Sequence, residues 1–325
     1  MSNYTDASLI YYPSGYKAGK AYSLKPTDGS GDLTFTRAST ATRVNSAGLI
    51  ESVATGVPRI DFTGAGCAKL LLEPQRTNLV FPSATASTQT VITTAQSYTL
   101  SFYGTGTVVR SGTSTGTLVG TGANDRVFVT FTATAGSLIL TVTGSVTNWQ
   151  LEAGAYLTSV IITTTTAVTR TQDSASRTAA SAFVGLSSGT IYLDLYQEIK
   201  SGELDILSIN NASTNYLLRC RLNGNSLSFA YNGGTGGTNL AANVNLVNNS
   251  RNKIAIKYNA ATKVSRTYFN GVFHSTTTGA NAYPVLAQNN ILIGPWFGTS
   301  YMQLQGLMLF TTELSDADLE TLTTL

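Results

Sequence analysis

The stretch that decides the fold reads Tyr98-Thr99-Leu100-Ser101-Phe102-Tyr103. Apolar side chains alternate in it with hydroxyl-bearing ones, and this is the period of a β-strand with one buried face. The same alternation returns at 127–132 (Val-Phe-Val-Thr-Phe-Thr) and at 138–143 (Leu-Ile-Leu-Thr-Val-Thr). Threonine suits the outer face because its β-branch fits a pleated surface. Glycines separate the runs, as short turns between strands require.

The strand pattern continues toward the C-terminus. One alternating run ends at Asn223-Gly224 and another at Asn270-Gly271, and an Asn-Gly pair between two such runs predicts a hairpin. The only clear helix signal lies at the end of the chain, where Ser315 and Asp318 form a start that resembles a capping box. We therefore predict an all-β protein.

Composition divides the chain into three segments. Residues 1–82 are irregular and hold most of the prolines, 83–178 are rich in Ser and Thr, and 179–325 form the longest strand-rich unit. We predict an irregular N-terminal attachment region over 1–82, followed by two tandem antiparallel β-sandwiches over 83–178 and 179–325.

The scarcity of charge excludes several classes of protein. Only 11% of the residues are charged and the net charge is +3, whereas about a quarter is usual. This excludes a strongly basic nucleic-acid binder. A single His and two Cys exclude a metal centre built from those residues, and we expect Cys67 and Cys220 to be free thiols. No apolar run is long enough to span a membrane and no secretory signal is readable, so we expect synthesis and assembly in a cytoplasm.

Several local motifs resemble known families. The stretch Leu71-Leu72-Glu73-Pro74-Gln75-Arg76-Thr77-Asn78-Leu79, together with 33–42, 48–51 and 57–62, resembles a segment of tailed-bacteriophage and prophage structural proteins. Residues 150–154, 158–159 and 167–170 resemble the closing strands of a carbohydrate-binding-module-like jelly roll. Residues 189–191, 268–272, 291–294 and 314–319 are similar to a laminin-G/concanavalin-A-like lectin domain.

This resemblance implies a virion protein. The first hypothesis is a tail fibre or receptor-binding protein whose C-terminal lectin-like domain contacts host surface glycan. The alternative is a capsid-decorating head fibre or accessory virion protein without a specific ligand. Either version implies other virion proteins as partners, through the N-terminal region, and favours a homotrimer. We expect no nucleic-acid partner, no membrane insertion and no cofactor.

Catalysis is not expected. Glu203 and Asp205 share a strand face, as in sandwich glycosidases that carry a Glu-x-Asp-x-x-Glu strand, but Ser208 stands where the second Glu belongs. Hydrolysis with retention needs two carboxyl groups, and 206–312 contain no Asp or Glu. The same gap disfavours a calcium site, which usually needs several carboxylates. His274, the only histidine, is expected on a surface hairpin.

Sugar sites combine aromatic faces with planar amides, and three parts of the last segment offer them. Trp296, Phe297 and Tyr301 lie close together in the sequence, and Trp296 is expected either in a sugar-binding loop or buried in the core. Trp149, in contrast, is expected in the core of the first sandwich. The candidate carbohydrate-binding residues are Trp296, Phe297, Tyr301, Tyr231, Asn232 and Asn270.

Two further surfaces are open to more than one interpretation. The stretch without carboxylates contains seven cations. They are expected to form either an electropositive face for an acidic glycan or a neighbouring subunit, or solvated strand positions whose charge is balanced by acids elsewhere in the domain. The cations are Arg219, Arg221, Arg251, Lys253, Lys257, Lys263 and Arg266. The N-terminal segment is rich in tyrosine, which suits an attachment interface or an extra strand layer on the jelly roll; its tyrosines are Tyr4, Tyr11, Tyr12, Tyr16 and Tyr22.

Overall fold

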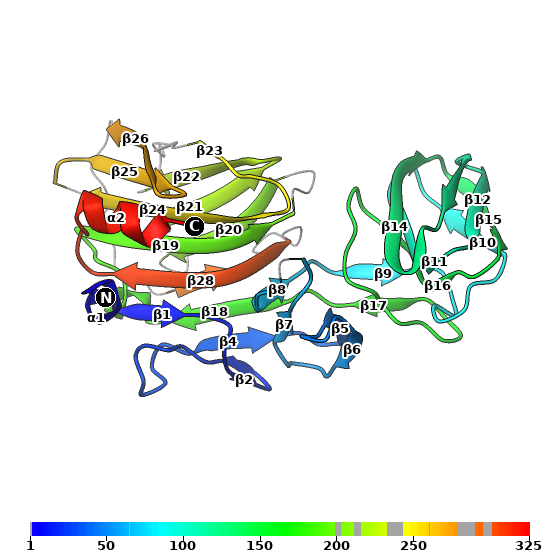
Figure 1. Ribbon diagram of the computed structural model, residues 1–325, viewed down its shortest axis with the longest axis horizontal. Helices are drawn as coiled ribbons and strands as arrows, with labels where there is room; N and C mark the ends of the chain where they lie inside the picture. The colour runs from blue at the N-terminus through cyan, green and yellow to red at the C-terminus, as the bar shows by residue number, and fades with distance from the viewer. Residues whose placement is uncertain are drawn as a thin grey trace.

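The protein consists of two β-sheet lobes that lie side by side along its longest axis (Figure 1). The computed structural model describes residues 2–64, 66–198, 203–210, 216–232, 243–259, 261–278, 290–294 and 301–325. Strands make up nearly all of the regular structure, and every strand pair is antiparallel. The all-β prediction is therefore confirmed.

The larger lobe contains two extended sheets. Within the described residues the first runs in the order β26 (Val272–Thr278), β25 (Val264–Phe269), β24 (Ser250–Asn259), β19 (Ser188–Gln197), β28 (Met302–Phe310), β8 (Lys69–Leu72) and β7 (Arg59–Asp61), with β1 (Leu9–Tyr11) also beside β28. The second runs in the order β2 (Tyr16–Lys17), β3 (Lys20–Ala21), β4 (Leu33–Thr36), β18 (Ser174–Thr178), β27 (Asn290–Ile293), β20 (Glu203–Asn210), β21 (Tyr216–Asn223), β22 (Ser226–Asn232) and β23 (Val244–Asn245).

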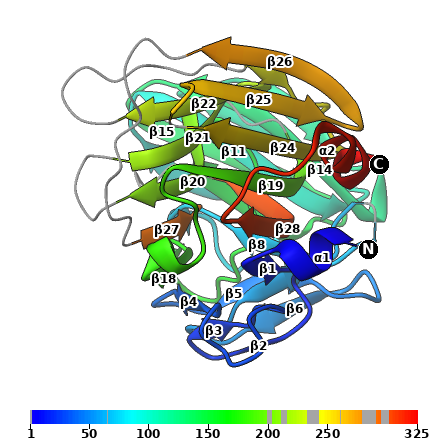
Figure 2. The ribbon, with the colours of Figure 1, turned by 90° about the vertical axis from the view of Figure 1, so that its left-hand side faces the viewer.

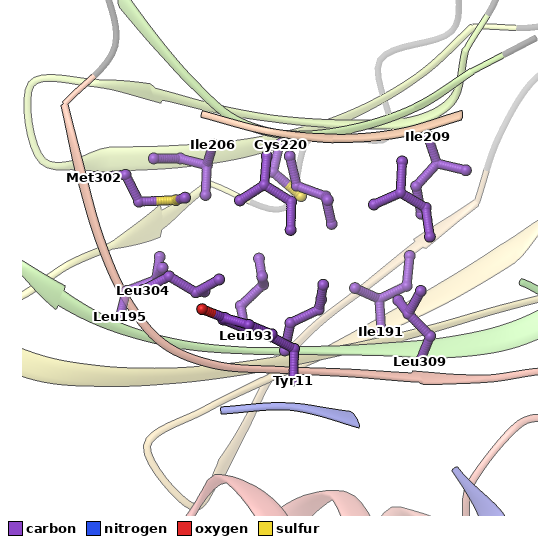
Figure 3. Packing of buried hydrophobic residues seen from close by; sticks show 14 of the residues in the cluster. Tyr11, Ile191, Leu193, Leu195, Ile206, Ile209, Cys220, Met302, Leu304 and Leu309 are labelled. Carbon is purple, nitrogen blue, oxygen red and sulfur yellow. The ribbon is translucent and has the colours of Figure 1, made fainter. Parts of the chain in front are cut away.

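One hydrophobic core lies between these two sheets. Figure 3 shows Ile191 and Leu193 of β19 pointing toward Ile206 and Cys220 of the opposite sheet. Burial of such side chains contributes about 1.5–3 kcal/mol each, so a core of this size dominates the stability of the lobe. Tyr11, from the N-terminal segment, lies in the same core and is fully buried.

The N-terminal segment is thus a structural part of the larger lobe. Its strands β1, β7 and β8 belong to the first sheet, and β2, β3 and β4 to the second. The register of β1 on β28 places Leu9 opposite Leu309. The sequence-based division into three consecutive units needs correction here. Buried residues from Leu9 to Leu72 share one core with the last segment rather than adding a layer to the jelly roll, whereas Val80 belongs to the core of the smaller lobe. The strands of the N-terminal segment have only two to four residues each, and so few residues show no clear alternation of apolar and polar side chains.

The smaller lobe is inserted between two strands of the larger one. It has a four-stranded sheet, β10 (Gln89–Thr93), β15 (Gly136–Thr143), β12 (Thr107–Gly112) and β13 (Gly116–Val119), and a three-stranded sheet, β14 (Gly122–Ala133), β11 (Gln96–Gly104) and β16 (Thr147–Ala153). Trp149 is fully buried in its core and donates Nε1–H to the carbonyl of Pro82 at 2.7 Å. The predicted core position of Trp149 is confirmed.

Two chain crossings join the lobes, and they pair with each other. β9 (Arg76–Asn78) leads into the smaller lobe and β17 (Val168–Arg170) leads out, with Asn78 opposite Val168 (Figure 1). A two-stranded hairpin, β5 (Ala41–Val44) with β6 (Ile50–Val53), lies on the larger lobe near this junction. The chain therefore enters and leaves the smaller lobe at the same place.

The predicted turns and the C-terminal helix form as expected. Asn223 is followed by a turn into β22, and Asn270 and Gly271, with φ of 48° and 84°, join β25 to β26. Positive φ at both central residues is the geometry that makes Asn-Gly a hairpin pair. Ser315 accepts a hydrogen bond from the Asp318 amide at 3.1 Å and caps α2 (Asp316–Thr323), which lies on the outer face of the first sheet with α1 (Ser2–Asp6) nearby (Figure 2). A single 3₁₀ turn spans Ala180–Ala182.

Candidate functional site

The sugar-binding residues expected from the sequence do not form one site in the described structure. Trp296 and Phe297 lie outside the described residues, and Tyr231 and Asn232 lie at the end of β22. Asn270 holds its turn against the neighbouring strand β24, because its side-chain oxygen accepts a hydrogen bond from the amide of Lys253 at 2.9 Å. Tyr301 is the exception: it borders a pocket between the two lobes.

The tyrosines of the N-terminal segment also have separate environments. Tyr11 is fully buried in the core and cannot touch a partner in the folded chain, whereas Tyr4 is 52% exposed. Tyr16 accepts a hydrogen bond from Arg43 Nη1 at 2.8 Å, and Tyr12 borders a second pocket. Tyr22 is partly buried. They do not form a single aromatic surface.

Three cations of the basic stretch form ion pairs with acids of the same lobe. Arg251 pairs with the buried carboxylate of Asp194, and Lys257 and Arg266 both pair with Asp316. These pairs favour the interpretation in which the cations occupy balanced strand positions. His274 is exposed on β26, as predicted.

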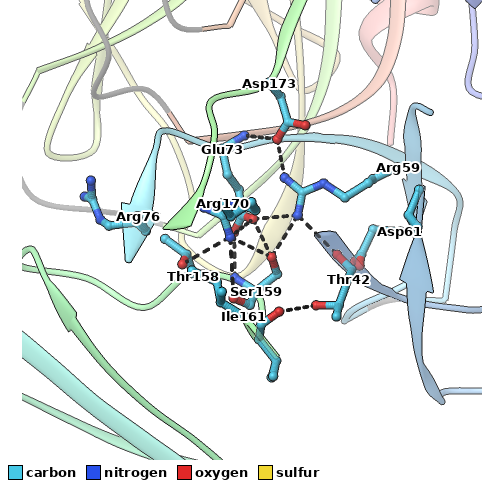
Figure 4. A network of polar contacts seen from close by, with 12 residues as sticks. Thr42, Arg59, Asp61, Glu73, Arg76, Thr158, Ser159, Ile161, Arg170 and Asp173 are labelled. Atoms are coloured by element: carbon cyan, nitrogen blue, oxygen red, sulfur yellow. Dashed lines mark hydrogen bonds and ion pairs between the residues drawn. The ribbon is translucent and has the colours of Figure 1, made fainter. Parts of the chain in front are cut away.

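Residues of the phage-like and jelly-roll-like motifs, together with Asp173, form a buried ion network where the lobes meet (Figure 4). We call it the junction network; its members are Arg37, Arg59, Glu73, Arg170 and Asp173. Arg59 Nη1 donates to Glu73 Oε2 at 2.7 Å, and Arg170 Nη1 lies 2.9 Å from the same oxygen. Arg37 pairs with Asp173 at 3.0 Å, and Arg59 binds Asp173 through Nη2. Three guanidinium groups thus share two carboxylates, with all five side chains buried.

Hydrogen bonds saturate the carboxylate of Glu73. Besides the arginines, the amide and the hydroxyl of Ser159 donate to it at 2.7 and 2.6 Å. Burial alone would raise the pKa of Glu73, but Arg170, Arg59 and Ser159 together hold that pKa far below its ordinary value. Glu73 therefore stays ionised near neutral pH and cannot serve as a proton donor in catalysis.

The loop of 157–160 from the smaller lobe is held against this network. Thr158 donates its hydroxyl to the buried carboxylate of Glu152 at 2.6 Å, and Thr42 of the larger lobe donates its hydroxyl to the carbonyl of Val160. Arg126 of the smaller lobe donates Nη1 to the carbonyl of Thr158 at 2.7 Å. These contacts fix one wall of a pocket between the lobes.

The junction pocket has a volume of about 180 Å³. Its wall from the smaller lobe includes Tyr103 and Arg126, and its wall from the larger lobe includes Asp61, Tyr301 and Gln303. Its full lining is Thr42, Arg43, Val44, Ile50, Asp61, Thr63, Leu71, Glu73, Tyr103, Arg126, Leu157, Thr158, Ser159, Val160, Glu198, Tyr301 and Gln303.

Two polar atoms of this lining have no partner among the described residues. They are Oε1 of Gln303, a side chain that is 1% exposed, and Nε of Arg126. A buried polar atom without a hydrogen bond costs about 1–3 kcal/mol, so these positions favour a polar ligand. The Tyr301 phenol accepts from Gln303 Nε2 at 2.9 Å, and burial together with the carboxylates of Glu198 and Glu73 raises its pKa well above the ordinary value.

The junction pocket therefore offers an acceptor, a cationic donor and aromatic faces within one enclosed space. Asp61 is already committed to the fold, because its carboxylate accepts hydrogen bonds from the amides of Val44 and Thr63, each at 2.8 Å. Such a surface can hold a hydroxyl-rich ligand in a fixed orientation.

The sequence contained a signal for the junction network but not for the pocket. Arg37, Arg59 and Glu73 lie inside the motifs that carry the phage resemblance, and Arg170 lies in the motif that resembles the jelly roll, with Asp173 three residues further on. Gln303 and Arg126 belong to no motif, and their meeting depends on the way two distant segments pack.

Other kinds of site are absent from what the structure describes. No three His, Cys, Asp or Glu side chains gather there in a way that could hold a metal ion. Neither Cys67 nor Cys220 forms a disulfide, as predicted. No helix in the described ranges is both long and apolar enough to cross a membrane.

Comparison with known proteins gives a distant structural similarity only. No protein-family model and no curated protein matches the sequence. A CBM40 domain of Ruminococcus gnavus IT-sialidase, solved with α2,3-sialyllactose, is 15% identical over 43% of this chain and 84% of that chain, with a TM-score of 0.39. Leech intramolecular trans-sialidase is 17% identical over 43% of this chain and 23% of that chain, with a TM-score of 0.37. A botulinum neurotoxin type C structure concerned with ganglioside interaction is 13% identical over 47% of this chain and 39% of that chain, with a TM-score of 0.39. At these values the similarity decides nothing about a ligand.

Proposed function

We propose that this chain is a bacteriophage virion protein, a tail fibre or receptor-binding protein, that binds host surface glycan in the junction pocket. The observation that carries the binding proposal is the pair of unpartnered polar atoms on Gln303 and Arg126, which border one pocket with Tyr103 and Tyr301. A sugar hydroxyl can donate to Gln303 Oε1 and accept from Arg126, and the C–H face of a sugar ring can pack on a tyrosine.

The virion part of the proposal rests on the sequence motifs. Three of their charged residues, Arg37, Arg59 and Glu73, take part in the junction network, so the motifs that resemble phage proteins help to hold one lobe against the other. The proposal includes a non-enzymatic role, partners in the virion and a homotrimeric state. Tyr4 at the exposed N-terminal helix is the tyrosine of the attachment segment best placed to meet such a partner.

The glycan test uses two glutamines on one strand. Gln303 and Gln305 of β28 are both buried, but Gln303 borders the junction pocket and Gln305 does not. The full chain is assayed on an array of bacterial capsular, lipopolysaccharide and teichoic polysaccharides. Gln303→Leu should weaken binding about tenfold, because the hydrogen bond that it removes contributes about 1–1.5 kcal/mol. Gln305→Leu should leave junction-pocket binding unchanged. Binding by Gln303→Leu that equals that of the native chain would refute the assignment of the glycan to this pocket.

A separate experiment tests the virion proposal. Immunogold labelling of purified particles, from cells that carry the gene, should place the protein on the tail. Labelling of the capsid would favour a head decoration instead, and the absence of label would refute the virion assignment.

A further inference from the structure

A second pocket lies on the larger lobe, beside the same strand β28. Its volume is about 200 Å³, and we call it the Tyr12 pocket. It is lined by Tyr12, Pro13, Ser14, Cys67, Ala68, Arg251 and Gln305. It shares no lining residue with the junction pocket.

A buried acid fixes the guanidinium group at this pocket. Arg251 donates Nε to Asp194 Oδ1 at 2.9 Å and Nη2 to Asp194 Oδ2 at 2.5 Å. Asp194 is fully buried, whereas the side chain of Arg251 is 42% exposed. This side-on pair leaves Nη1 without a hydrogen-bond partner among the described residues, so a donor of fixed orientation borders the pocket.

Gln305 contributes an acceptor. Its side chain is only 5% exposed, and its Oε1 is buried without a partner in the described part of the chain. No hydrogen bond holds either end of this amide in the described part of the chain, so the amide is available to a ligand. A hydroxyl group that enters the pocket can form the missing hydrogen bond.

Tyr12 and Pro13 supply an apolar wall. The ring of Tyr12 lies directly over Gly306, where an added Cβ would come within 2.5 Å of Cε1. A side chain at position 306 would displace the ring, so the glycine allows Tyr12 to lie against the backbone of β28. A ring so fixed can pack against the C–H face of a sugar without a further loss of conformational entropy.

We propose that the Tyr12 pocket binds an uncharged sugar or related polyol through neighbouring hydroxyl groups. One hydroxyl donates to Gln305 and the next accepts from Arg251 Nη1, while the carbon face of the ring lies on Tyr12. This site does not depend on the function proposed for the junction pocket.

An anionic ligand fits this pocket less well. Asp194 compensates the charge of Arg251, so the pair has no net charge to offer an anion. A phosphate dianion or a carboxylate at neutral pH also lacks the proton that the buried oxygen of Gln305 requires. The two observations together favour a neutral ligand that both donates and accepts.

Cys67 supplies a direct reporter of occupancy. It is exposed and borders the pocket, whereas Cys220 is buried in the core. The rate of Cys67 alkylation by iodoacetamide is measured by mass spectrometry on the native full chain, with and without galactose, glucose or N-acetylglucosamine, and with sodium phosphate at equal ionic strength. At least one sugar should slow the reaction, by roughly fivefold when four-fifths of the sites are occupied. Phosphate should not.

Two variants assign this protection to the pocket. Gln305→Leu should abolish it and Gln303→Leu should keep it, with near-ultraviolet circular dichroism as the check of folding. Tyr12→Leu is the second variant if Gln305→Leu does not fold. The proposal is overturned if none of the sugars slows alkylation, if Gln305→Leu or Tyr12→Leu is protected as well as the native chain, or if phosphate protects as strongly as a sugar.

Discussion

Arg37 and Asp173 are 136 positions apart in the sequence, and they form an ion pair at 3.0 Å with both side chains fully buried. Arg37 follows a strand of the N-terminal segment, and Asp173 follows the crossing by which the chain returns from the smaller lobe. Asp173 also binds Arg59 and accepts the amide of Glu73 at 2.9 Å. A single carboxylate therefore joins three parts of the chain.

Asp173→Ala should destabilise the larger lobe strongly. It leaves the buried guanidinium group of Arg37 without an acid and Arg59 with Glu73 alone, and breaking a buried pair in this way costs about 3–5 kcal/mol. Urea unfolding measures the loss. Lys20→Ala is the control: Lys20 pairs with Asp32 at 3.5 Å but is 42% exposed, so its loss should cost at most about 1 kcal/mol. Equal effects of the two variants would show that the junction network contributes no more than a surface pair.

The stability of the lobe should fall in acid because of Glu73. Its pKa in the folded state is far below the ordinary value of about 4.3 expected in the unfolded chain. A depressed folded-state pKa gives stability that is complete above the unfolded value and is lost as the pH falls below it. The free energy of unfolding, measured in urea from pH 6 to pH 2.5, should therefore decline below about pH 4.3. Glu73→Gln should flatten that decline, and an unchanged pH dependence in the variant would contradict the assignment.

Trp149→Ala should destabilise the smaller lobe by about 3–5 kcal/mol, as expected for a fully buried aromatic residue. The variant also leaves the carbonyl of Pro82 without its donor. Thermal unfolding followed by circular dichroism checks it. Ile92→Ala in the same lobe is the matched control, because Ile92 is 73% exposed and its truncation should change stability by at most about 0.5 kcal/mol.

Removal of residues 1–12 should yield insoluble protein. Leu9 and Tyr11 are fully buried, and β1 pairs with β28, so the deletion opens the core and frees a strand edge for aggregation. Soluble yield and size-exclusion profile measure the result. Removal of residues 2–6 alone, where Tyr4 is exposed, should leave the protein soluble. A soluble monodisperse chain without residues 1–12 would contradict the role given to β1.

Local signals predicted the parts of the fold that depend on nearby residues. Asn270-Gly271 forms its hairpin because those two residues accept positive φ, and Ser315 caps its helix because its hydroxyl reaches an amide three residues on. Trp149 was placed in a core by the alternation around it. For the hairpin and the helix cap the decisive contact spans only a few positions, whereas Trp149 also contacts distant residues such as Pro82.

Distant contacts could not be read in the same way. Leu9 to Tyr11 form a strand because β28 lies beside them. Three residues are too few to show the alternation that predicts a strand from sequence. Arginine and glutamate are expected at the surface unless a partner is known, so nothing local marked Arg59 or Glu73 as buried. Of the sugar-site candidates, Tyr301 alone reaches a described pocket, and the polar atoms beside it come from segments that no motif connects.

The pairing of Leu9 with Leu309 has a consequence for synthesis on the ribosome. The larger lobe cannot complete its first sheet until β28 (Met302–Phe310) has emerged, whereas the smaller lobe is contiguous and can fold while translation continues. The apolar strand β1 therefore stays without its strand partner until residues about 300 positions later have been made. Long-range strand pairing of this kind is intrinsically slow, so the early segment is the part of the newborn chain that most needs protection by a chaperone.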